Sequence, residues 1–230
     1  MTLVIAHRGA SAAEPENTLA AFARAVALGA EGIELDVRRT ADDRLVVHHD
    51  AHLPDGRVIR RTAAGELPDH VPTLEAALDA CAGAFVNIEI KNDPNDPDHD
   101  PSNWVASRVA TELDRRGDAA RWLISSFNLA TVDRMRNVAP FVRTAWLTYQ
   151  LDTEVIATAA AHRHPAVHPY YELVDADGLR AAHVAGLAVN TWTCDDPARM
   201  ADLIAWGIDG ICTNVPDVAL AVRASAGTRA

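Results

Sequence analysis

Short apolar runs alternate with longer amphipathic stretches along almost the whole chain. The runs have the length and side-chain types of buried strands, and they predict strands at Leu3–Ala6, Gly32–Val37, Phe85–Ile90, Trp122–Ser126, Val142–Leu147, Ala166–His168, Leu187–Thr191 and Gly210–Thr213. Between them, apolar positions recur with helical spacing and predict helices at Thr18–Leu28, Leu74–Ala82, Ser102–Arg116, Leu129–Val138, Thr153–Ala161, Asp175–Val184, Pro197–Trp206 and Val215–Ala224. The pattern predicts an α/β protein.

Several helices begin with residues that favour a helix start. Asn17 precedes the first helix and Thr73 the second, and both types can accept a hydrogen bond from a free backbone N–H. Eight strand–helix pairs in 230 residues favour a (β/α)8 TIM barrel, which typically needs about 250 residues. A doubly wound open sheet has the same local pattern and remains the alternative.

Two segments interrupt the alternation. Leu45–His49 predicts an extra strand after the second one, and a polar segment follows it as far as Val71. Asn92–Pro101 is rich in Asp and Pro and predicts a loop, whose aspartates favour a solvated role over a second cation site. No linker divides the chain, so we expect a single domain over residues 1–230.

The composition is that of a globular protein, with 49% hydrophobic and 23% charged residues. The formal charge of −11, without any long run of Lys and Arg, argues against a nucleic-acid partner. Three scattered cysteines do not form a disulfide framework, and no segment has the pattern of a secretory signal or a membrane span. We therefore expect a cytoplasmic protein without stable membrane insertion; the oligomeric state is left open.

Charged residues stand on the strands where a barrel carries its catalytic groups. Glu34 and Asp36 are two positions apart and share one face of a strand, and so do Glu89 and Lys91. Buried carboxylates are costly unless they are paired or bind a metal ion. Three carboxylates suit a hard cation, Mg²⁺ or Ca²⁺, better than zinc.

The charges of this group indicate an anionic substrate. If the side chains converge, one divalent cation with Arg8 and Lys91 exceeds the three carboxylates by one positive charge, which a single phosphodiester would neutralise. The planar fork of Arg8 can hold two phosphate oxygens at once.

Histidines at two strand ends are candidates for proton transfer. His7 follows the first strand, and His48 and His49 end the extra strand. Two imidazoles on opposite sides of a phosphorus could act as general base and general acid. His48 and His49 point to opposite faces, so only one of them is expected to reach the site. His168, at the end of the sixth strand, is a further candidate for substrate contact.

An ordered set of motifs runs through essentially the whole chain. It comprises His7-Arg8-Gly9, Glu16-Asn17-Thr18, Gly32–Val37, Leu45–Asp50, Pro72–Glu75, Ile88–Lys91, Ser125–Phe127, Val189–Thr193 and Gly207–Asn214. With these motifs the sequence resembles the glycerophosphodiester phosphodiesterases of the phospholipase-C-like phosphodiesterase superfamily. The resemblance implies a somewhat distorted TIM barrel.

The resemblance also implies roles for individual residues. The catalytic histidines of the family correspond to His7 and His49, and its phosphate-holding positions to Arg8 and Lys91. Trp192 matches an aromatic residue that lines the pocket, although core packing explains it equally well. The metal-binding acids of the family correspond to Glu34, Asp36 and Glu89.

The implied reaction is metal-dependent hydrolysis of a small-molecule glycerophosphodiester to sn-glycerol 3-phosphate and an alcohol. One divalent cation, Mg²⁺ or Ca²⁺, would assist it. The alternatives are a lysophospholipase D-type phosphodiesterase of the same superfamily and a non-catalytic barrel that binds metal or phosphate. The motifs do not decide which alcohol is released, or which histidine is the acid.

One departure from the family concerns the segment after the extra strand. Residues 50–72 form only a short insertion, where the family usually has a longer subdomain that covers the pocket. A shorter cover suggests a more open mouth and bulkier diesters. Its arginines could meet a second anionic group, although a solvated loop is the favoured interpretation for Arg57, Arg60 and Arg61.

Overall fold

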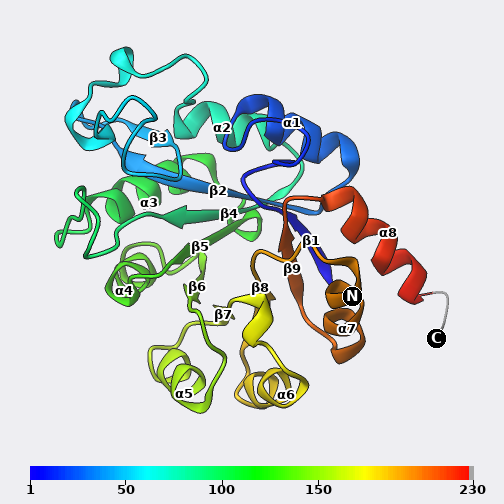
Figure 1. Ribbon diagram of the computed structural model, residues 1–230. Coiled ribbons are helices and arrows are strands. Elements are labelled where there is room, and N and C mark those ends of the chain that lie inside the picture. Colours follow the sequence, from blue (N-terminus) through cyan, green and yellow to red (C-terminus); the bar gives the residue numbers. More distant parts are fainter. Residues whose placement is uncertain (228–230) are drawn as a thin grey trace.

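A computed structural model describes residues 1–227, which fold into a closed barrel surrounded by helices (Figure 1). The strands are β1 Leu3–Ala6, β2 Gly32–Arg39, β3 Leu45–Val47, β4 Phe85–Ile90, β5 Trp122–Ser126, β6 Arg143–Leu147, β7 Ala166–His168, β8 Ala188–Thr191 and β9 Gly210–Thr213. The helices are α1 Leu19–Leu28, α2 Leu74–Ala80, α3 Trp104–Arg116, α4 Leu129–Val138, α5 Thr153–Ala161, α6 Ala176–Val184, α7 Pro197–Trp206 and α8 Pro216–Gly227. Short 3₁₀ helices lie at Ile59–Arg61, Ala64–Glu66, Ala119–Arg121 and Tyr171–Leu173.

The strand order closes the sheet on itself. It runs β1-β9-β8-β7-β6-β5-β4-β2-β3, and β1 also pairs with β2. All of these pairs are parallel except that of β3, which lies antiparallel to β2 outside the ring. The predicted TIM barrel is therefore confirmed, and the open sheet is excluded.

Side chains of β2 alternate between the barrel interior and the helices. Ile33, Leu35 and Val37 are buried in the core cluster that includes Phe22 of α1. The residues between them, Glu34 and Asp36, point the other way, into the barrel. Burial of the apolar face against the helices is what stabilises a strand that carries two acids on its other face, at about 1.5–3 kcal/mol for each large aliphatic side chain.

The start of α1 differs from the prediction that Asn17 caps it. Thr18 is the N-cap residue, and its hydroxyl accepts a hydrogen bond from the backbone N–H of Ala21. Asn17 adopts a positive φ of 57°, and its side chain turns to Asp36 of β2. The prediction was wrong because two adjacent polar residues could both cap the helix, and only the tertiary partner distinguishes them.

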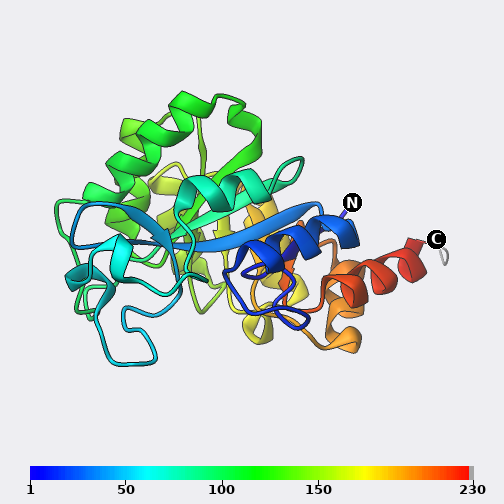
Figure 2. The same ribbon diagram turned by 90° about the horizontal axis from the view of Figure 1, so that it is seen from above.

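The segment between β3 and α2 forms a small unit of its own. Its 3₁₀ helices close over a minor apolar cluster of Val46, Leu53, Ile59 and Leu67. In Figure 2 this cyan segment lies at the end of the molecule away from both marked termini. Arg57 and Arg61 are exposed, as the expected solvated loop requires, and Arg57 is bonded to Asp55. Arg60 differs, because it is half-buried and donates to the carbonyl of Thr40, outside this segment.

The acidic loop after β4 is attached to the barrel by a buried arginine. Arg38 of β2 is paired with Asp98 at 2.6 Å and with Asp96 at 3.0 Å, and the Asp98 side chain is only 4% exposed. The expectation of a solvated loop is therefore wrong for these two aspartates. Arg38 also donates from Nε to the carbonyl oxygen of His49, so the loop and the end of the extra strand share one anchor.

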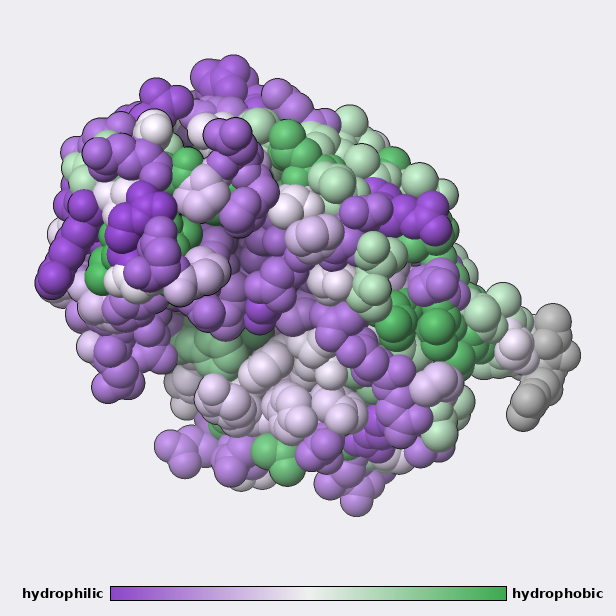
Figure 3. All heavy atoms as spheres, turned by 45° about the horizontal axis from the view of Figure 1, so that its top comes forward, coloured by the Kyte–Doolittle hydropathy of each residue, from purple (hydrophilic) through white to green (hydrophobic). Residues whose placement is uncertain are grey.

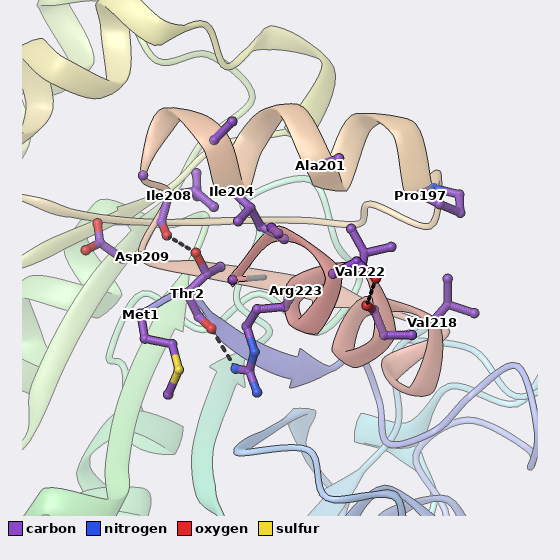
Figure 4. Close-up of a pocket in the computed structure, with 16 residues that line it drawn as sticks. Met1, Thr2, Pro197, Ala201, Ile204, Ile208, Asp209, Val218, Val222 and Arg223 are labelled. Atoms are coloured by element: carbon purple, nitrogen blue, oxygen red, sulfur yellow. Dashed lines mark hydrogen bonds between the residues drawn. The ribbon is translucent and has the colours of Figure 1, made fainter. Parts of the chain in front are cut away.

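A cavity of about 1030 Å³ opens at the amino-terminal ends of the barrel strands, between α7, α8 and the first residues of the chain. Figure 4 shows that its walls are mainly apolar side chains, with Thr2 donating to the carbonyl of Ile208 and Arg223 donating to the carbonyl of Thr2. It is lined by none of the predicted site residues.

The face in Figure 3 is largely hydrophilic, and its green residues gather mainly toward the side of the C-terminal helix. No helix within residues 1–227 has the length and apolar composition needed to cross a membrane.

Candidate active site

The carboxyl ends of the strands surround a narrow cavity of about 60 Å³. Although they come from distant parts of the sequence, most of the predicted site residues line it, namely His7, Arg8, Glu34, His49, Glu89, Lys91 and Trp192. Asp36 is buried next to this group and contacts Lys91. The structure therefore brings all of the predicted site residues together.

Three carboxylates form a buried acidic triad at the base of the site: Glu34, Asp36 and Glu89. Asp36 is paired in register with Glu89 on the neighbouring strand, and the three groups offer oxygens within 4.8 Å of one another. Burial, with the charges of the other two acids, raises the pKa of Glu34 well above its usual range. Its Oε1 atom is buried without a hydrogen-bond partner. A hard cation would satisfy this oxygen and the uncompensated charge, so the donor set fits Mg²⁺ or Ca²⁺.

Two cationic side chains partly balance the acidic triad. Lys91 lies 2.5 Å from Glu89 and 2.9 Å from Asp36, and Arg8 lies 3.4 Å from Asp36. Against the effect of burial, these two charges lower the pKa of Asp36 below its usual range. The guanidinium of Arg8 is also held at 2.8 Å by Glu16, at the entrance to the first helix.

His7 is held in one orientation by a partner near the other end of the chain. Its Nδ1–H donates to Oδ1 of Asn214, at 2.8 Å. The amide of Asn214 is fixed in turn, because its Nδ2 donates to Asp195 at 2.6 Å. Burial, helped by the charge of Arg8, lowers the pKa of His7 to about 4, so the ring is neutral at pH 7. Its Nε2 atom, which lies 3.4 Å from the hydroxyl of Thr193, keeps the lone pair that can accept a proton.

His49 stands across the cavity on the segment after β3. Its Nδ1 is 2.7 Å from the carboxylate of Asp50, and its side chain is 35% exposed. The hydrogen bond from His49 lowers the pKa of Asp50, so this carboxylate stays charged beside the imidazole. His48 bonds the carbonyl of Asp50 and is not among the residues lining the cavity.

An aromatic wall completes the cavity on the side of β5 to β8. The ring of Trp192 lies within 5.7 Å, centroid to centroid, of Phe127, Tyr149 and Tyr170, and its indole N–H donates to the carbonyl of His168. Trp192 therefore both packs and lines the cavity. His168 is fully buried beside it, and burial lowers its pKa to about 3, so it is a neutral wall residue.

A wider groove of about 440 Å³ adjoins the narrow cavity and shares His49, Glu89, Lys91 and Phe127 with it. Its outer wall carries Asp50, Asp93 and Asp96 and the ring of Tyr149. A phosphodiester has two substituents on phosphorus, and a narrow cavity joined to a wide groove offers one place for each.

Sequence reasoning assigned no role in the site to several residues that organise it. Asn17 bonds Asp36 at 2.7 Å, Asn214 bonds His7, and Asp195 fixes Asn214. Asn17 and Asn214 stand inside the motifs that were recognised, which was the only available signal. Their partners lie on other strands, and the spacing of residues in the sequence does not reveal such contacts.

Comparisons with known proteins agree with this geometry. Residues 7–218 match the model of the glycerophosphoryl diester phosphodiesterase family. A glycerophosphodiester phosphodiesterase from Caldanaerobacter subterraneus subsp. tengcongensis is 31% identical over 247 residues, covering 94% of this chain and 95% of its own. A crystal structure of a glycerophosphodiester phosphodiesterase from Parabacteroides distasonis is 28% identical, covers 98% of both chains and superposes with a TM-score of 0.86.

A third relative adds support for the fold. A phosphodiesterase from Oleispira antarctica, solved in complex with the product sn-glycerol-3-phosphate, has a TM-score of 0.89 at 23% identity over 96% of each chain. The motifs, the barrel and the family match over residues 7–218 all agree. The chain belongs to the glycerophosphoryl diester phosphodiesterase family.

Proposed function

We propose that this chain hydrolyses glycerophosphodiesters to sn-glycerol 3-phosphate and an alcohol, with His7 and His49 as the proton-transfer pair. The observation that carries the proposal is the convergence of two imidazoles, from β1 and from the segment after β3, on one cavity beside the acidic triad. The Oleispira antarctica relative holds sn-glycerol-3-phosphate in the same fold, which supports this substrate class.

The two histidines would have different roles because their surroundings differ. His7 is buried and neutral, and its Nδ1–H donates to Asn214. We therefore assign His7 as the general base, which accepts a proton at Nε2 from the nucleophile, either water or the glycerol 2-hydroxyl. His49 is more exposed and lies beside the Asp50 carboxylate, so we assign it the general acid that protonates the leaving alcohol. Arg8 and Lys91 would hold the phosphoryl oxygens.

The acidic triad would hold one divalent cation, which when bound supplies positive charge to the phosphoryl group as it reacts. The family is metal-dependent, and Glu34, Asp36 and Glu89 are the candidate ligands in this chain. We propose Mg²⁺ or Ca²⁺ because all three donors are carboxylates. Before the ion binds, the positive charge of Lys91 would offset part of the negative charge of the triad.

The place of the alcohol is the wide groove beside His49. The short segment 50–72, which we regard as an insertion within one domain, would leave this groove open to bulky substituents.

Three free and buried cysteines support a cytoplasmic location.

The test is release of glycerol 3-phosphate from glycerophosphocholine, glycerophosphoethanolamine and glycerophosphoglycerol, each with Mg²⁺, Ca²⁺, Mn²⁺ or EDTA. We expect EDTA to abolish turnover and one cation to restore it. His7→Ala and His49→Ala should each lower kcat at least about 10²-fold. His48→Ala is the matched control, because this neighbour does not line the cavity, and it should keep most of the activity.

Near-normal turnover in either histidine variant would refute the assignment. Release of choline from lysophosphatidylcholine, without turnover of the three water-soluble diesters, would identify the lysophospholipase D-type activity instead. Binding of the metal without turnover of any diester would identify a non-catalytic barrel.

A further inference from the structure

A second group of potential metal ligands lies outside the active site, beside β6 and β7. Asp133 comes from the middle of α4, His162 ends α5, and His164 follows two residues later, just before β7 begins. The active-site wall residue His168 is at the opposite end of β7. This group therefore sits toward the amino-terminal end of the barrel and shares no residue with the proposed catalytic site.

The three side chains converge closely enough to share one ion. Nδ1 of His162 is 2.8 Å from Oδ2 of Asp133, and Nε2 of His164 is 3.2 Å from Oδ1 of the same carboxylate. All three ligand atoms lie within 4.8 Å of one another. Tetrahedral zinc with bonds of about 2.0–2.1 Å places its ligand atoms about 3.3 Å apart, which is close to the 2.8 Å and 3.2 Å between each ring nitrogen and the carboxylate oxygen that it faces.

The contact between the side chains of His164 and Asp133 lacks the geometry of a hydrogen bond. The His164 side chain is completely buried, and neither its Nε2 nor Oδ1 of Asp133 has a hydrogen-bond partner, although the two atoms face each other. The other ring nitrogen, Nδ1, is paired with the hydroxyl of Thr144 at 2.9 Å. If Nδ1 carries the ring proton, a lone pair on Nε2 faces a carboxylate oxygen, and a cation between the two would relieve the repulsion.

We propose that Asp133, His162 and His164 form a Zn²⁺-binding site distinct from the acidic triad. Two imidazoles and one carboxylate are a usual protein ligand set for zinc, with a water molecule as the fourth ligand. The Thr144 hydroxyl would fix the orientation of the His164 ring, as outer-sphere partners of metal-bound histidines commonly do. The half-exposed His162 ring would give the ion access from solvent.

The donor atoms separate the two sites chemically. The acidic triad offers only carboxylates and suits a hard cation, whereas this group offers two nitrogens and one oxygen. A zinc ion here would link α4 to the end of α5, two helices that pack on neighbouring strands. The proposal does not depend on the enzyme activity, because its test measures binding.

The experiment is calorimetric titration of the purified full-length protein with Zn²⁺, in excess Mg²⁺ or Ca²⁺ to occupy the acidic triad. We expect one zinc site that Asp133→Asn and His162→Gln each weaken at least about tenfold. Zn²⁺ should also raise the Tm of the wild type and lose this effect in both variants. His162 is half-exposed and lies outside the hydrophobic core clusters, so this variant tests the site even if others fold poorly.

His183→Gln is the matched control, because His183 makes a similar pair with Asp209 at 2.8 Å but has no third ligand among residues 1–227. This variant should bind Zn²⁺ like the wild type. If Asp133→Asn and His162→Gln bind the same number of Zn²⁺ ions with unchanged affinity, the proposal is wrong. A loss of affinity in His183→Gln equal to that in His162→Gln would also overturn it, since it would show only general binding to surface histidines.

Discussion

Asn214 determines which nitrogen of His7 carries the proton, because its amide is oriented by Asp195 and presents only an oxygen to the ring. A carboxylate at this position would stabilise the imidazolium and raise the pKa of His7 from about 4. Asn214→Asp should therefore move the acidic limb of kcat/KM to higher pH. Asn214→Ala should lower kcat at least about tenfold, because the ring loses its fixed tautomer.

The pH profile of kcat/KM for wild type and both variants is the measurement. Asn214→Asp should keep substantial activity on the alkaline side, which separates a change in protonation from a folding defect. An acidic limb that stays in place in Asn214→Asp would mean that another group controls it.

His168 links stability to pH, because burial keeps its ring neutral. Its pKa is lowered from 6.5 to about 3, whereas in the unfolded chain it binds a proton below about 6.5. The unfolded state then binds more protons, so the free energy of unfolding falls as the pH drops from about 6.5 toward 3, by up to about 1.4 kcal/mol per pH unit. His168→Gln should remove about 1 kcal/mol per pH unit from this slope between pH 6 and 4.5.

Urea unfolding at several pH values measures the slope. His70→Gln is the control and should change the slope little, because this histidine is exposed and makes no ion pair within residues 1–227. Equal slopes in wild type and His168→Gln would show that His168 does not titrate in this way.

At the scale of elements, the turn from β1 to α1 depends on the absence of a side chain at Gly9. Gly9 has a φ of 85°, and a Cβ atom there would lie 2.6 Å from the backbone of Ala21. Gly56 has almost the same φ but nothing within 4 Å of such an atom. Gly56→Ala should cost only the left-handed strain of about 1–2 kcal/mol. Gly9→Ala should cost about 1–3 kcal/mol more, because the helix must also move.

Chemical denaturation measures the free energy of unfolding of the two variants. The difference between them separates the cost of backbone strain from the cost of the close contact with Ala21. Gly9 directly follows His7 and Arg8, so its variant should also lose turnover, whereas Gly56→Ala should keep it. Equal destabilisation by the two substitutions would show that the contact with Ala21 relaxes without cost.

The elements were largely predictable, but the contacts between them were not. Short apolar runs identified every barrel strand, and the i, i+2 spacing placed Glu34 and Asp36 on one face, as the structure has them. The prediction of Asn17 as the cap failed, because the role of Asn17 depends on Asp36 of β2, the strand next to β1. The ion pairs of Arg38 with the loop could not be predicted from the sequence, since its partners lie 58 and 60 residues away.

At the scale of the whole molecule, the charge of −11 should repel an anionic substrate before it reaches the cavity. The Debye length falls from about 30 Å at 0.01 M salt to about 10 Å at 0.1 M. For the anionic glycerophosphoglycerol we expect kcat/KM to rise several-fold over this range. For the zwitterionic glycerophosphocholine it should change much less.

Steady-state kinetics at saturating metal and varied NaCl would measure this difference. A fall of kcat/KM with salt for glycerophosphoglycerol would contradict the prediction. It would mean that the local field of Arg8 and Lys91 outweighs the net charge of the molecule.

The pairing of β1 with β9 makes the site depend on the order in which the chain is synthesised. His7 is synthesised first, and Asn214 follows 207 residues later. At about 5–20 residues per second, the two are made about 10–40 s apart. Throughout that interval the nascent chain carries a histidine without its orienting amide and a sheet that has not closed. The protein thus gains an oriented His7, the proposed catalytic base, only after β9 and Asn214 have been made, and any product truncated before β9 lacks this orientation.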